Sequence, residues 1–406
     1  MNSTNLWSGF KTNQNRLSSR FHLLVWLWVM VSVLVPQSAF AGIDHLKISA
    51  FKSDRAARGL LLDVVDSGKY LVAVGERGHI VFSADQGKTW KQAEVPVYVT
   101  LTAVFFASAE KGWAVGHEGV VLHSRDGGQS WSKQLDGFEI NEQFLKLTQS
   151  RFEAAQKAVN EAIDDTRREE AAIQLEQMEY AIADAKEDAK VGPAKPLLDV
   201  WFKNENEGYV VGSYGIFLHT DDGGENWSLW SDRIDNPDGF HLNAIAATDK
   251  GTILLVGEAG LMHRSSDDGK SWQPLLPPYE GSFFGLLNHK GTLLTFGLRG
   301  SLFRSTDQGD SWTPINLPSS VSLAGGVVTA AGDITVVGGG GAVIHSSDGG
   351  KSFKLTVRPN RLPLSSVIEL ADKNMLAVGF LGVQHMNNQG VDLSVENKKT
   401  GQSTRE

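Results

Sequence analysis

One stretch of sequence decides the fold: Gly-His-Glu-Gly-Val-Val-Leu-His-Ser-Arg-Asp-Gly-Gly-Gln-Ser-Trp, at residues 116–131. It joins a Gly-x-x-Gly element to an octapeptide that runs from Ser124 to Trp131. Aspartate side chains accept hydrogen bonds from nearby backbone N–H groups, and glycine adopts the positive φ that reverses a chain. The octapeptide therefore predicts a turn between two strands, and its Trp is large enough to pack between neighbouring units.

The pattern repeats along the chain. The octapeptide occurs six times, each copy follows a Gly-x-x-Gly element, and a seventh Gly-x-x-Gly begins at Gly379 with a degenerate octapeptide at residues 387–390. Alternating apolar residues around each copy are typical of four short strands, and a period of roughly 40 residues is typical of a propeller blade. We therefore predict an all-β, seven-bladed β-propeller. Six octapeptide aspartates are expected to be structural: Asp85, Asp126, Asp222, Asp267, Asp307 and Asp348.

Closure of the ring needs a fourth strand for blade seven, because its octapeptide is degenerate. We predict that the propeller spans residues 42–390 and that residues 44–51, which precede the first inner strand, form the outer strand that closes blade seven. An open strand edge is thereby avoided. Residues 391–395 alternate in the same way and are the competing candidate, while residues 391–406 otherwise read as a polar C-terminal tail.

An insertion separates blades two and three, where successive Gly-x-x-Gly elements begin 96 residues apart. Residues 139–191 contain no Gly or Pro and are rich in helix formers, so we predict an α-helical hairpin. Residues 166–169 have the form of a capping box and predict the start of its second helix. The hairpin is acidic, with 13 acids and 7 bases over residues 138–190. It either shields a blade edge or forms a partner interface.

The first 41 residues are typical of a Sec-type signal peptide. Lys11, Arg16 and Arg20 precede an apolar run at residues 21–35, and small residues follow up to Ala41. We predict cleavage after Ala41 and a periplasmic protein, because the run is shorter than the roughly 20 residues that span a bilayer. A retained membrane anchor is the alternative.

Composition excludes several classes of function. The sequence has no Cys, which excludes disulfides, thiolate metal sites and cysteine nucleophiles. The net charge of −9 argues against nucleic-acid binding, which requires a basic face. A single Asp per turn supplies too few oxygens for calcium. We expect no metal and no cofactor.

The Gly-x-x-Gly turns and the insertion are expected on one face of the ring. In a four-stranded blade, the turn between strands two and three lies at the same end as the link to the next blade. The residue pairs between the glycines differ in every blade, as a heterologous partner surface requires. The candidate partner-binding residues are Glu76, Arg77, His117, Glu118, Tyr214, Glu258, Arg299 and Phe380.

The Gly-x-x-Gly turn, the short strand ending in His-Ser and the Asp-Gly-Gly-x-Ser-Trp run together resemble the photosystem II stability and assembly factor family of seven-bladed propellers. The resemblance covers residues 44–390 apart from the insertion. It implies a non-enzymatic, monomeric scaffold for a membrane protein complex. Its partner would be an exported domain of a photosystem subunit or of a resistance-nodulation-division (RND) type transporter. The absence of a lipoprotein cysteine and of a twin-arginine signal favours a periplasmic relative.

A sialidase-like glycoside hydrolase is the alternative function, because the octapeptide is also the Asp box of sialidases. Its active site would use the Gly-x-x-Gly face. Arg77, Arg299, Tyr214 and Glu258 are suitable residue types, but two arginines fall short of the three that hold a sialic acid carboxylate. We therefore predict that the protein is not an enzyme.

Overall fold

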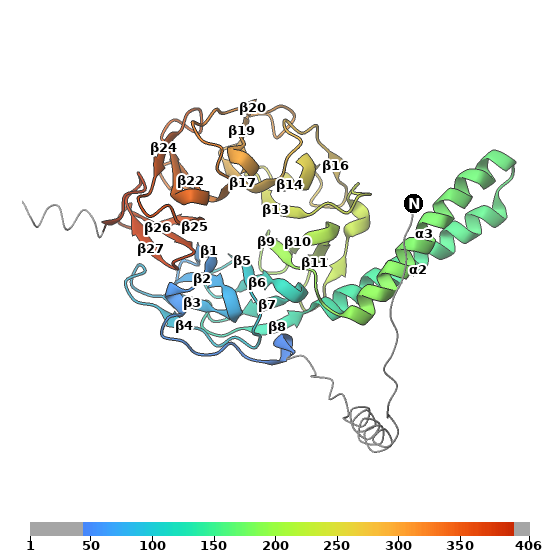
Figure 1. The fold of residues 1–406 in the computed structure, drawn as a ribbon, viewed down its shortest axis with the longest axis horizontal. Coiled ribbons are helices and arrows are strands. Elements are labelled where there is room, and N and C mark those ends of the chain that lie inside the picture. Colours follow the sequence, from blue (N-terminus) through green and yellow to red (C-terminus); the bar gives the residue numbers. More distant parts are fainter. Residues whose placement is uncertain (1–43, 394–406) are drawn as a thin grey trace, which may run out of the picture. The chain divides into compact units, whose positions relative to one another are not determined.

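Seven antiparallel sheets stand around a central channel in the computed structural model, which describes residues 44–393 (Figure 1). The predicted signal peptide at residues 1–41 and the tail from residue 394 lie outside the described residues. Within them, six sheets have four strands and one has three, and in every sheet the strands are adjacent in chain order. The chain is a seven-bladed β-propeller with an inserted helical hairpin, as predicted.

Each blade is one contiguous segment of the chain. Blade two is β5 (Leu101–Phe106), β6 (Gly112–Gly116), β7 (Val121–Ser124) and β8 (Ser132–Leu135). Blade one is β1 (Leu61–Asp66), β2 (Leu71–Gly75), β3 (Ile80–Ser83) and β4 (Lys91–Gln92); blade three is β9 (Leu197–Phe202), β10 (Gly208–Gly212), β11 (Phe217–Thr220) and β12 (Ser228–Leu229). Blade four is β13 (Leu242–Ala247), β14 (Ile253–Gly257), β15 (Met262–Ser265) and β16 (Gln273–Pro274); blade five is β17 (Phe283–His289), β18 (Thr292–Gly297), β19 (Leu302–Ser305) and β20 (Thr313–Pro314). Blade six is β21 (Leu323–Val328), β22 (Ile334–Gly338), β23 (Ala342–Ser346) and β24 (Lys354–Val357); blade seven is β25 (Leu364–Glu369), β26 (Met375–Gly379) and β27 (Gln384–Met386).

The core lies between the blades. Strands β2, β6 and β10, the second strands of blades one, two and three, are buried at every residue, because both faces of each strand pack against neighbouring blades. The octapeptide tryptophans fill these spaces: Trp131 of blade two is buried beside Val72 of blade one. Burial of a large aromatic ring stabilises the contact by a few kcal/mol, in line with about 25 cal/mol per Å² of apolar surface.

The octapeptide turn is held by its aspartate. In blade one, Asp85 accepts hydrogen bonds from Ser83 Oγ at 2.8 Å, from Thr89 N at 2.9 Å and from Thr89 Oγ1 at 2.6 Å. The indole N–H of Trp90 donates to Gly87 O at 2.9 Å, which orients the ring. Equivalent carboxylate networks hold the other five turns, at Asp126, Asp222, Asp267, Asp307 and Asp348.

Ring closure differs from the prediction: residues 44–51 are not the outer strand of blade seven. They form the short 3-10 helix η1 (His45–Lys47) and run along blade one, so that prediction is wrong. Ala50 N donates to Val95 O at 3.0 Å, and Tyr98 N donates to His45 O at 2.8 Å. These backbone hydrogen bonds and the ring contact between Phe51 and Tyr98 hold residues 44–51 against the stretch that follows β4 of blade one.

Blades seven and one instead meet through side chains. Leu61 and Val64 of β1 share one apolar cluster with Leu376 and Val378 of β26. On the outer side of blade seven, Asp392 forms an antiparallel bridge with Met386 of β27. The competing segment at residues 391–395 thus begins to pair where a fourth strand would lie, and its residues from 394 onward are outside the described part of the chain.

The inserted hairpin consists of α2 (Gly137–Glu161) and α3 (Asp165–Val191), which run side by side away from the ring (Figure 1). The side chain of Asp136 caps α2 by accepting from Phe138 N at 3.0 Å. Asp164 caps α3 by accepting from Arg167 N at 2.8 Å, so the N-cap lies two residues before Thr166, the N-cap that the capping-box pattern predicted.

The base of the hairpin is bound to blade three. The amide of Gln143 donates to Trp227 O at 3.0 Å and accepts from Leu229 N at 2.9 Å. It therefore satisfies two backbone groups on the outer edge of β12, as a further strand would. Ile140 is buried in the cluster between blades two and three, so the first turns of α2 belong to the propeller core.

Arg358 is a buried charge in the link between blades six and seven, with its side chain 1% exposed. Its Nη1 donates to Gln384 Oε1 at 2.6 Å, and its Nη2 is paired with Asp392. The pair ties the last described residues to β27.

We expect Asp392→Ala to lower the free energy of unfolding by about 3 kcal/mol, because it leaves a buried guanidinium without its counter-charge. Arg358→Met should cost less, since it removes the charge and keeps the apolar contacts. Urea denaturation at pH 7 measures both. Lys52→Ala, which breaks the exposed Lys52–Glu94 pair, is the control and should change stability by less than about 1 kcal/mol. Equal effects of the Asp392 and Lys52 variants would contradict this role.

The octapeptide turns should make the fold sensitive to acid. Hydrogen bonds from the Thr89, Ser271 and Ser311 side chains and backbone lower the pKa values of Asp85, Asp267 and Asp307, in that order, from the ordinary 3.8 to about 2. A depressed pKa in the folded state stabilises the fold above about pH 4, and this contribution is lost as the pH falls through about 2.

We expect the urea midpoint to fall as the pH is lowered from 4.5 to 2.5. The fall should be smaller in the triple variant Asp85→Asn, Asp267→Asn, Asp307→Asn, because an amide keeps two of the acceptor contacts and does not titrate in this range. Asp232→Asn, at an exposed carboxylate outside the octapeptide turns, is the control. The same pH slope in the triple variant as in the unaltered protein would overturn this explanation.

Candidate functional site

The Gly-x-x-Gly turns share one geometry. The residue after the first Gly donates its N–H to the carbonyl that precedes the inner strand, as Glu76 N does to Leu60 O at 3.0 Å. This brings the first Gly so close that a Cβ on Gly75 would lie 2.1 Å from Leu60 O. The last Gly has positive φ and lies against the link that leads to the next blade, as Gly78 does against Val97. Turns and links therefore form one continuous face.

The second variable residue of the turn has an unusual backbone conformation. In six blades it adopts a left-handed conformation with φ between 52° and 58°. For a residue with a Cβ this conformation costs roughly 1–2 kcal/mol, so a glycine would be the neutral choice. Five blades nevertheless keep a side chain there, and the five are Arg77, Glu118, Tyr214, Ala259 and Arg299. Retained strain of this kind is typical of surfaces with a function.

Four arginines lie along one half of the face, and we name them the arginine arc. Arg299 is in the turn of blade five and Arg77 in that of blade one. Arg361 lies beside Gly341 of blade six, and Arg58 lies beside Gly382 of blade seven. Of these four arginines, Arg77 alone has a carboxylate within 4 Å among the described residues, that of Glu76 at 3.7 Å.

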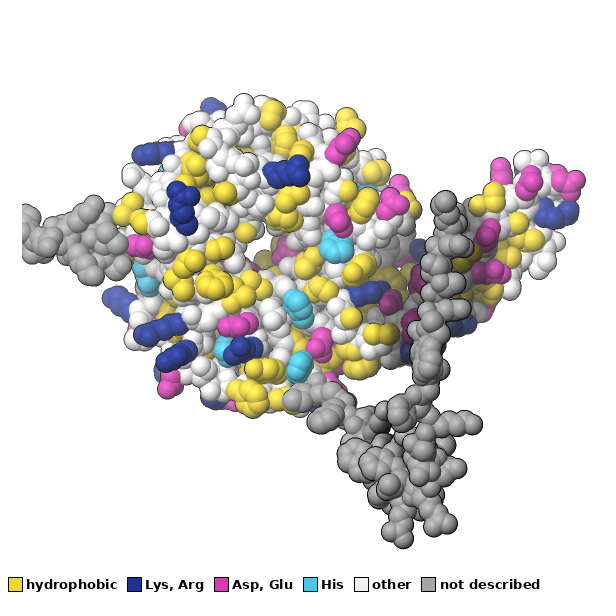
Figure 2. All heavy atoms as spheres, in the orientation of Figure 1, with side chains coloured by type: hydrophobic (Ala, Val, Ile, Leu, Met, Phe, Trp, Pro, Cys, Tyr) yellow, Lys and Arg dark blue, Asp and Glu magenta, His cyan; other side chains and the backbone are white. Residues whose placement is uncertain are grey.

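Exposed apolar side chains lie inside this arc. Phe380 and Leu381, in the turn of blade seven, are 58% and 46% exposed. Figure 2 shows hydrophobic side chains gathered over blades seven and one next to the centre of the ring, with basic side chains mainly over blades five, six, seven and one. The arc and the apolar pair together form a surface that is suited to an anion joined to an apolar group.

The other half of the face carries histidines and carboxylates. His45 Nδ1 lies 3.5 Å from Glu118, and His241 Nδ1 lies 3.2 Å from Glu258. Tyr214 contacts the ring of His241, with 5.0 Å between the ring centres. His117 is exposed in the turn of blade two. The face is thus divided into a basic half and a half of mixed charge.

Two of the predicted partner-binding residues have structural contacts. Glu76 Oε1 accepts from Leu60 N at 3.2 Å, and Glu258 Oε2 accepts from His241 N at 3.1 Å. Both carboxylates therefore hold a link against its turn. The sequence reasoning missed the arc members Arg58 and Arg361, which lie in links outside the repeated motifs.

The central channel opens on this face and contains two half-buried aspartates, Asp63 and Asp199. It encloses about 220 Å³ and is lined by the inner strands of all seven blades. Asp63 accepts from Val104 N of the next blade at 2.9 Å, and Asp199 accepts from Ile245 N in the same way at 2.9 Å. Burial raises the pKa of Asp199 to about 7 and also raises that of Asp63. These carboxyls join neighbouring blades.

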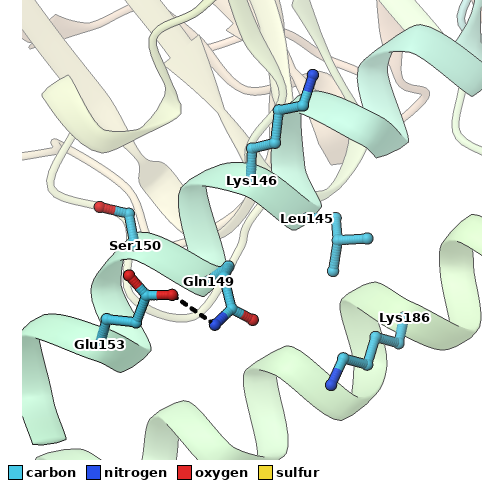
Figure 3. A pocket seen from close by; sticks show the side chains of 6 residues that line it. All are labelled: Leu145, Lys146, Gln149, Ser150, Glu153 and Lys186. Carbon is cyan, nitrogen blue, oxygen red and sulfur yellow. Dashed lines mark hydrogen bonds between the residues drawn. The ribbon is translucent and has the colours of Figure 1, made fainter.

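A second hollow lies on the hairpin, outside the predicted site. A groove of about 390 Å³ between α2 and α3 is lined by six side chains, and Figure 3 shows Lys186 of α3 across from those of α2. Gln149 donates to Glu153 at 2.8 Å within it. No group of three or more His, Cys, Asp or Glu residues within 44–393 is arranged to hold a metal ion.

The residues of the sialidase alternative do not form one cluster of contacts. Arg77 and Arg299 come from blades one and five, and Tyr214 and Glu258 come from blades three and four. Tyr214 contacts His241, and the carboxylate of Glu258 holds the same residue. This geometry offers a binding surface and does not favour hydrolysis.

No helix in the described part of the chain is long and apolar enough to cross a membrane.

Comparisons with known proteins agree with the geometry. A family model described as photosynthesis system II assembly factor YCF48 matches residues 56–138, 82–157 and 179–315. The photosystem II assembly protein Ycf48 of Synechococcus sp. (strain JA-2-3B'a(2-13)) is 26% identical over 286 residues, which are 68% of this chain and 80% of that protein. A photosystem II assembly lipoprotein Ycf48 of Synechococcus sp. (strain CC9902) is 36% identical over 83 residues, 20% of this chain and 24% of that protein.

A solved structure has the same fold. The structure of YCF48 bound to a D1 peptide aligns with a TM-score of 0.53 at 17% identity, over 81% of this chain and 94% of that one. The family model itself covers more than half of this chain, including all strands of blades one to five. The chain therefore belongs to the photosynthesis system II assembly factor YCF48 family.

Proposed function

We propose that the protein is an exported, non-catalytic assembly factor whose Gly-x-x-Gly face binds an extramembrane segment of a membrane protein. The arginine arc with Phe380 and Leu381 inside it is the observation that carries this proposal. Membership of a family of assembly factors supports a role without catalysis. The channel carboxyls bond to backbone N–H groups of neighbouring blades, which also favours a scaffold.

The chemistry of the face favours an acidic peptide that has apolar side chains. Arg58, Arg299 and Arg361 have no ion-pair partner among the described residues, and guanidinium groups bind carboxylates through paired, charge-assisted hydrogen bonds. Phe380 and Leu381 can accept an apolar side chain in the same peptide. The structure of YCF48 with a D1 peptide supports a peptide as the ligand of a propeller in this family.

The partner class is a subunit of a photosystem or an exported domain of an RND-type transporter. The signal-peptide pattern ending at Ala41 supports export to the periplasm, and a lipoprotein among the relatives supports a place outside the cytoplasm. The seven different turn pairs suit one heterologous partner, so we propose that the protein acts as a monomer.

A binding assay tests the face. Fluorescein-labelled D1 peptide, and acidic peptides from the extramembrane domain of an RND-type transporter, are titrated with the mature protein. We expect one of these sets to bind, and Arg299→Ala or Arg361→Ala to weaken binding about 10-fold or more each, since hydrogen bonds to charged groups contribute about 1.5–3 kcal/mol.

Lys88→Ala, on the octapeptide turn at the opposite end of blade one, is the matched control and should bind as the unaltered protein does. Thermal unfolding should stay unchanged in all three variants, because the side chains are exposed. Undiminished binding by both arginine variants would show that the wrong surface has been chosen.

Export is tested separately. We expect the mature protein in the periplasmic fraction with Gly42 as its first residue, because the small residues before that position suit a signal peptidase. Mass spectrometry of the purified protein measures the terminus, and Ala39→Lys with Ala41→Lys should leave the precursor uncleaved. A native protein that retains Met1 in the cytoplasm would contradict export.

A further inference from the structure

Helix α3 carries apolar side chains on two opposite sides. Ala171 and Ile182 are buried against α2, with Leu175 and Met178 half-buried between them. At about 100° per residue, Ile173 and Tyr180 lie on the side away from this packed stripe. They are 57% and 67% exposed and stand two turns apart. We name Ile173, Tyr180 and the acidic residues around them the outer stripe.

Carboxylates surround the two exposed side chains. Glu169, Glu170, Glu176 and Asp184 lie within about 60° of Ile173 around the helix axis, given 3.6 residues per turn. All four are exposed, and none has a Lys, Arg or His within 4 Å among the described residues. Residues 169–185 contain no basic residue at all, whereas the ends of α3 are paired, as in Arg168–Asp165 and Lys190–Glu187. Unpaired acid is therefore concentrated on the outer stripe.

The ring leaves this stripe free. The contacts between hairpin and propeller are at the base, where Gln143 bonds to the edge of β12 and Ile140 is buried between blades two and three. Figure 1 shows the rest of both helices extending beyond the ring. A partner that buried the exposed Ile173 and Tyr180 side chains would gain the free energy of removing their apolar surface from water.

The charge decides between possible occupants. A second copy of the chain would bring the same unpaired carboxylates against these, and an anionic lipid surface would also be repelled. A basic partner would neutralise them. Ile173 and Tyr180 are about 10 Å apart along the helix, the spacing at which one amphipathic helix packs its i and i+7 side chains against another.

We propose that the outer stripe of α3 is a second docking site, which binds a lysine- and arginine-rich amphipathic helix of a partner protein. The two apolar side chains would pack against the apolar face of that helix, and Glu169, Glu170, Glu176 and Asp184 would pair with its basic residues. The site is independent of the Gly-x-x-Gly face and of the function proposed for that face.

A pair of designed peptides tests the proposal. One is an 18-residue helix with leucine on one face and lysine elsewhere, and the other has glutamate in place of lysine. Fluorescence anisotropy with the mature full-length protein should show binding of the lysine peptide, weakening as salt is raised, and no binding of the glutamate peptide. Ile173→Ser with Tyr180→Ser should weaken binding about 10-fold or more, at unchanged helix content by circular dichroism.

Charge variants separate this site from non-specific attraction. Glu169→Lys with Glu176→Lys should abolish binding of the lysine peptide. Asp232→Lys with Asp238→Lys changes the net charge equally in the link between blades three and four, and should bind like the unaltered protein. D1-peptide binding should be unchanged in the hairpin variants, so a failure here is distinguishable from a failure at the arginine arc.

Three outcomes would overturn the proposal. The first is that the Ile173→Ser, Tyr180→Ser variant binds the lysine peptide as tightly as the unaltered protein does. The second is that both charge variants lose the same amount of lysine-peptide binding. The third is that the protein associates with itself and that the hairpin variants abolish this association. The last would show that the stripe binds a second copy.

Discussion

A single backbone contact, repeated seven times, fixes where each blade meets the face. The N–H that follows the first Gly of each turn donates to the carbonyl before the inner strand, at 2.8–3.3 Å. A side chain on that Gly would bring its Cβ to within 2.1–2.8 Å of the same carbonyl, so only Gly allows the approach. The contact sets each turn beside the start of its own blade. The last Gly of the turn then lies against the link to the next blade, and for this reason residues as distant as Arg58 and Gly382 are neighbours on the ring.

Repeated chemistry could be predicted from the sequence, and single long-range contacts could not. Each octapeptide encodes its own turn through Asp and Gly, and the seven Gly-x-x-Gly elements give the number of blades and the place of the hairpin. The path of residues 44–51 depends on hydrogen bonds to Val95 and Tyr98, which no local pattern encodes. Glu76 and Glu258 looked like partner-binding residues because they vary, yet their carboxylates hold links.

The candidate face shows the same limit. Arg77 and Arg299 could be found because they occupy a variable position inside a repeat. Arg361 and Arg58 lie in links whose lengths and sequences differ, and only the close packing of Gly341 and Gly382 against them reveals the arc. The hairpin fills one of its two predicted roles, because Gln143 shields the edge of β12. Its role as a partner interface stays a prediction, for which the distal part of α3 offers a surface that the ring does not cover.

The way the ring closes has a consequence for how the chain could be rearranged. Within residues 44–393 every blade is built from consecutive residues, and blades seven and one meet through side chains such as Leu61 and Leu376 without exchanging a strand. The position of the termini is thus a minor part of the architecture. A circular permutant with new ends at an exposed octapeptide turn would keep the inner three strands of each blade intact, and the same modularity explains how a long helical insertion fits between two blades without disturbing their neighbours.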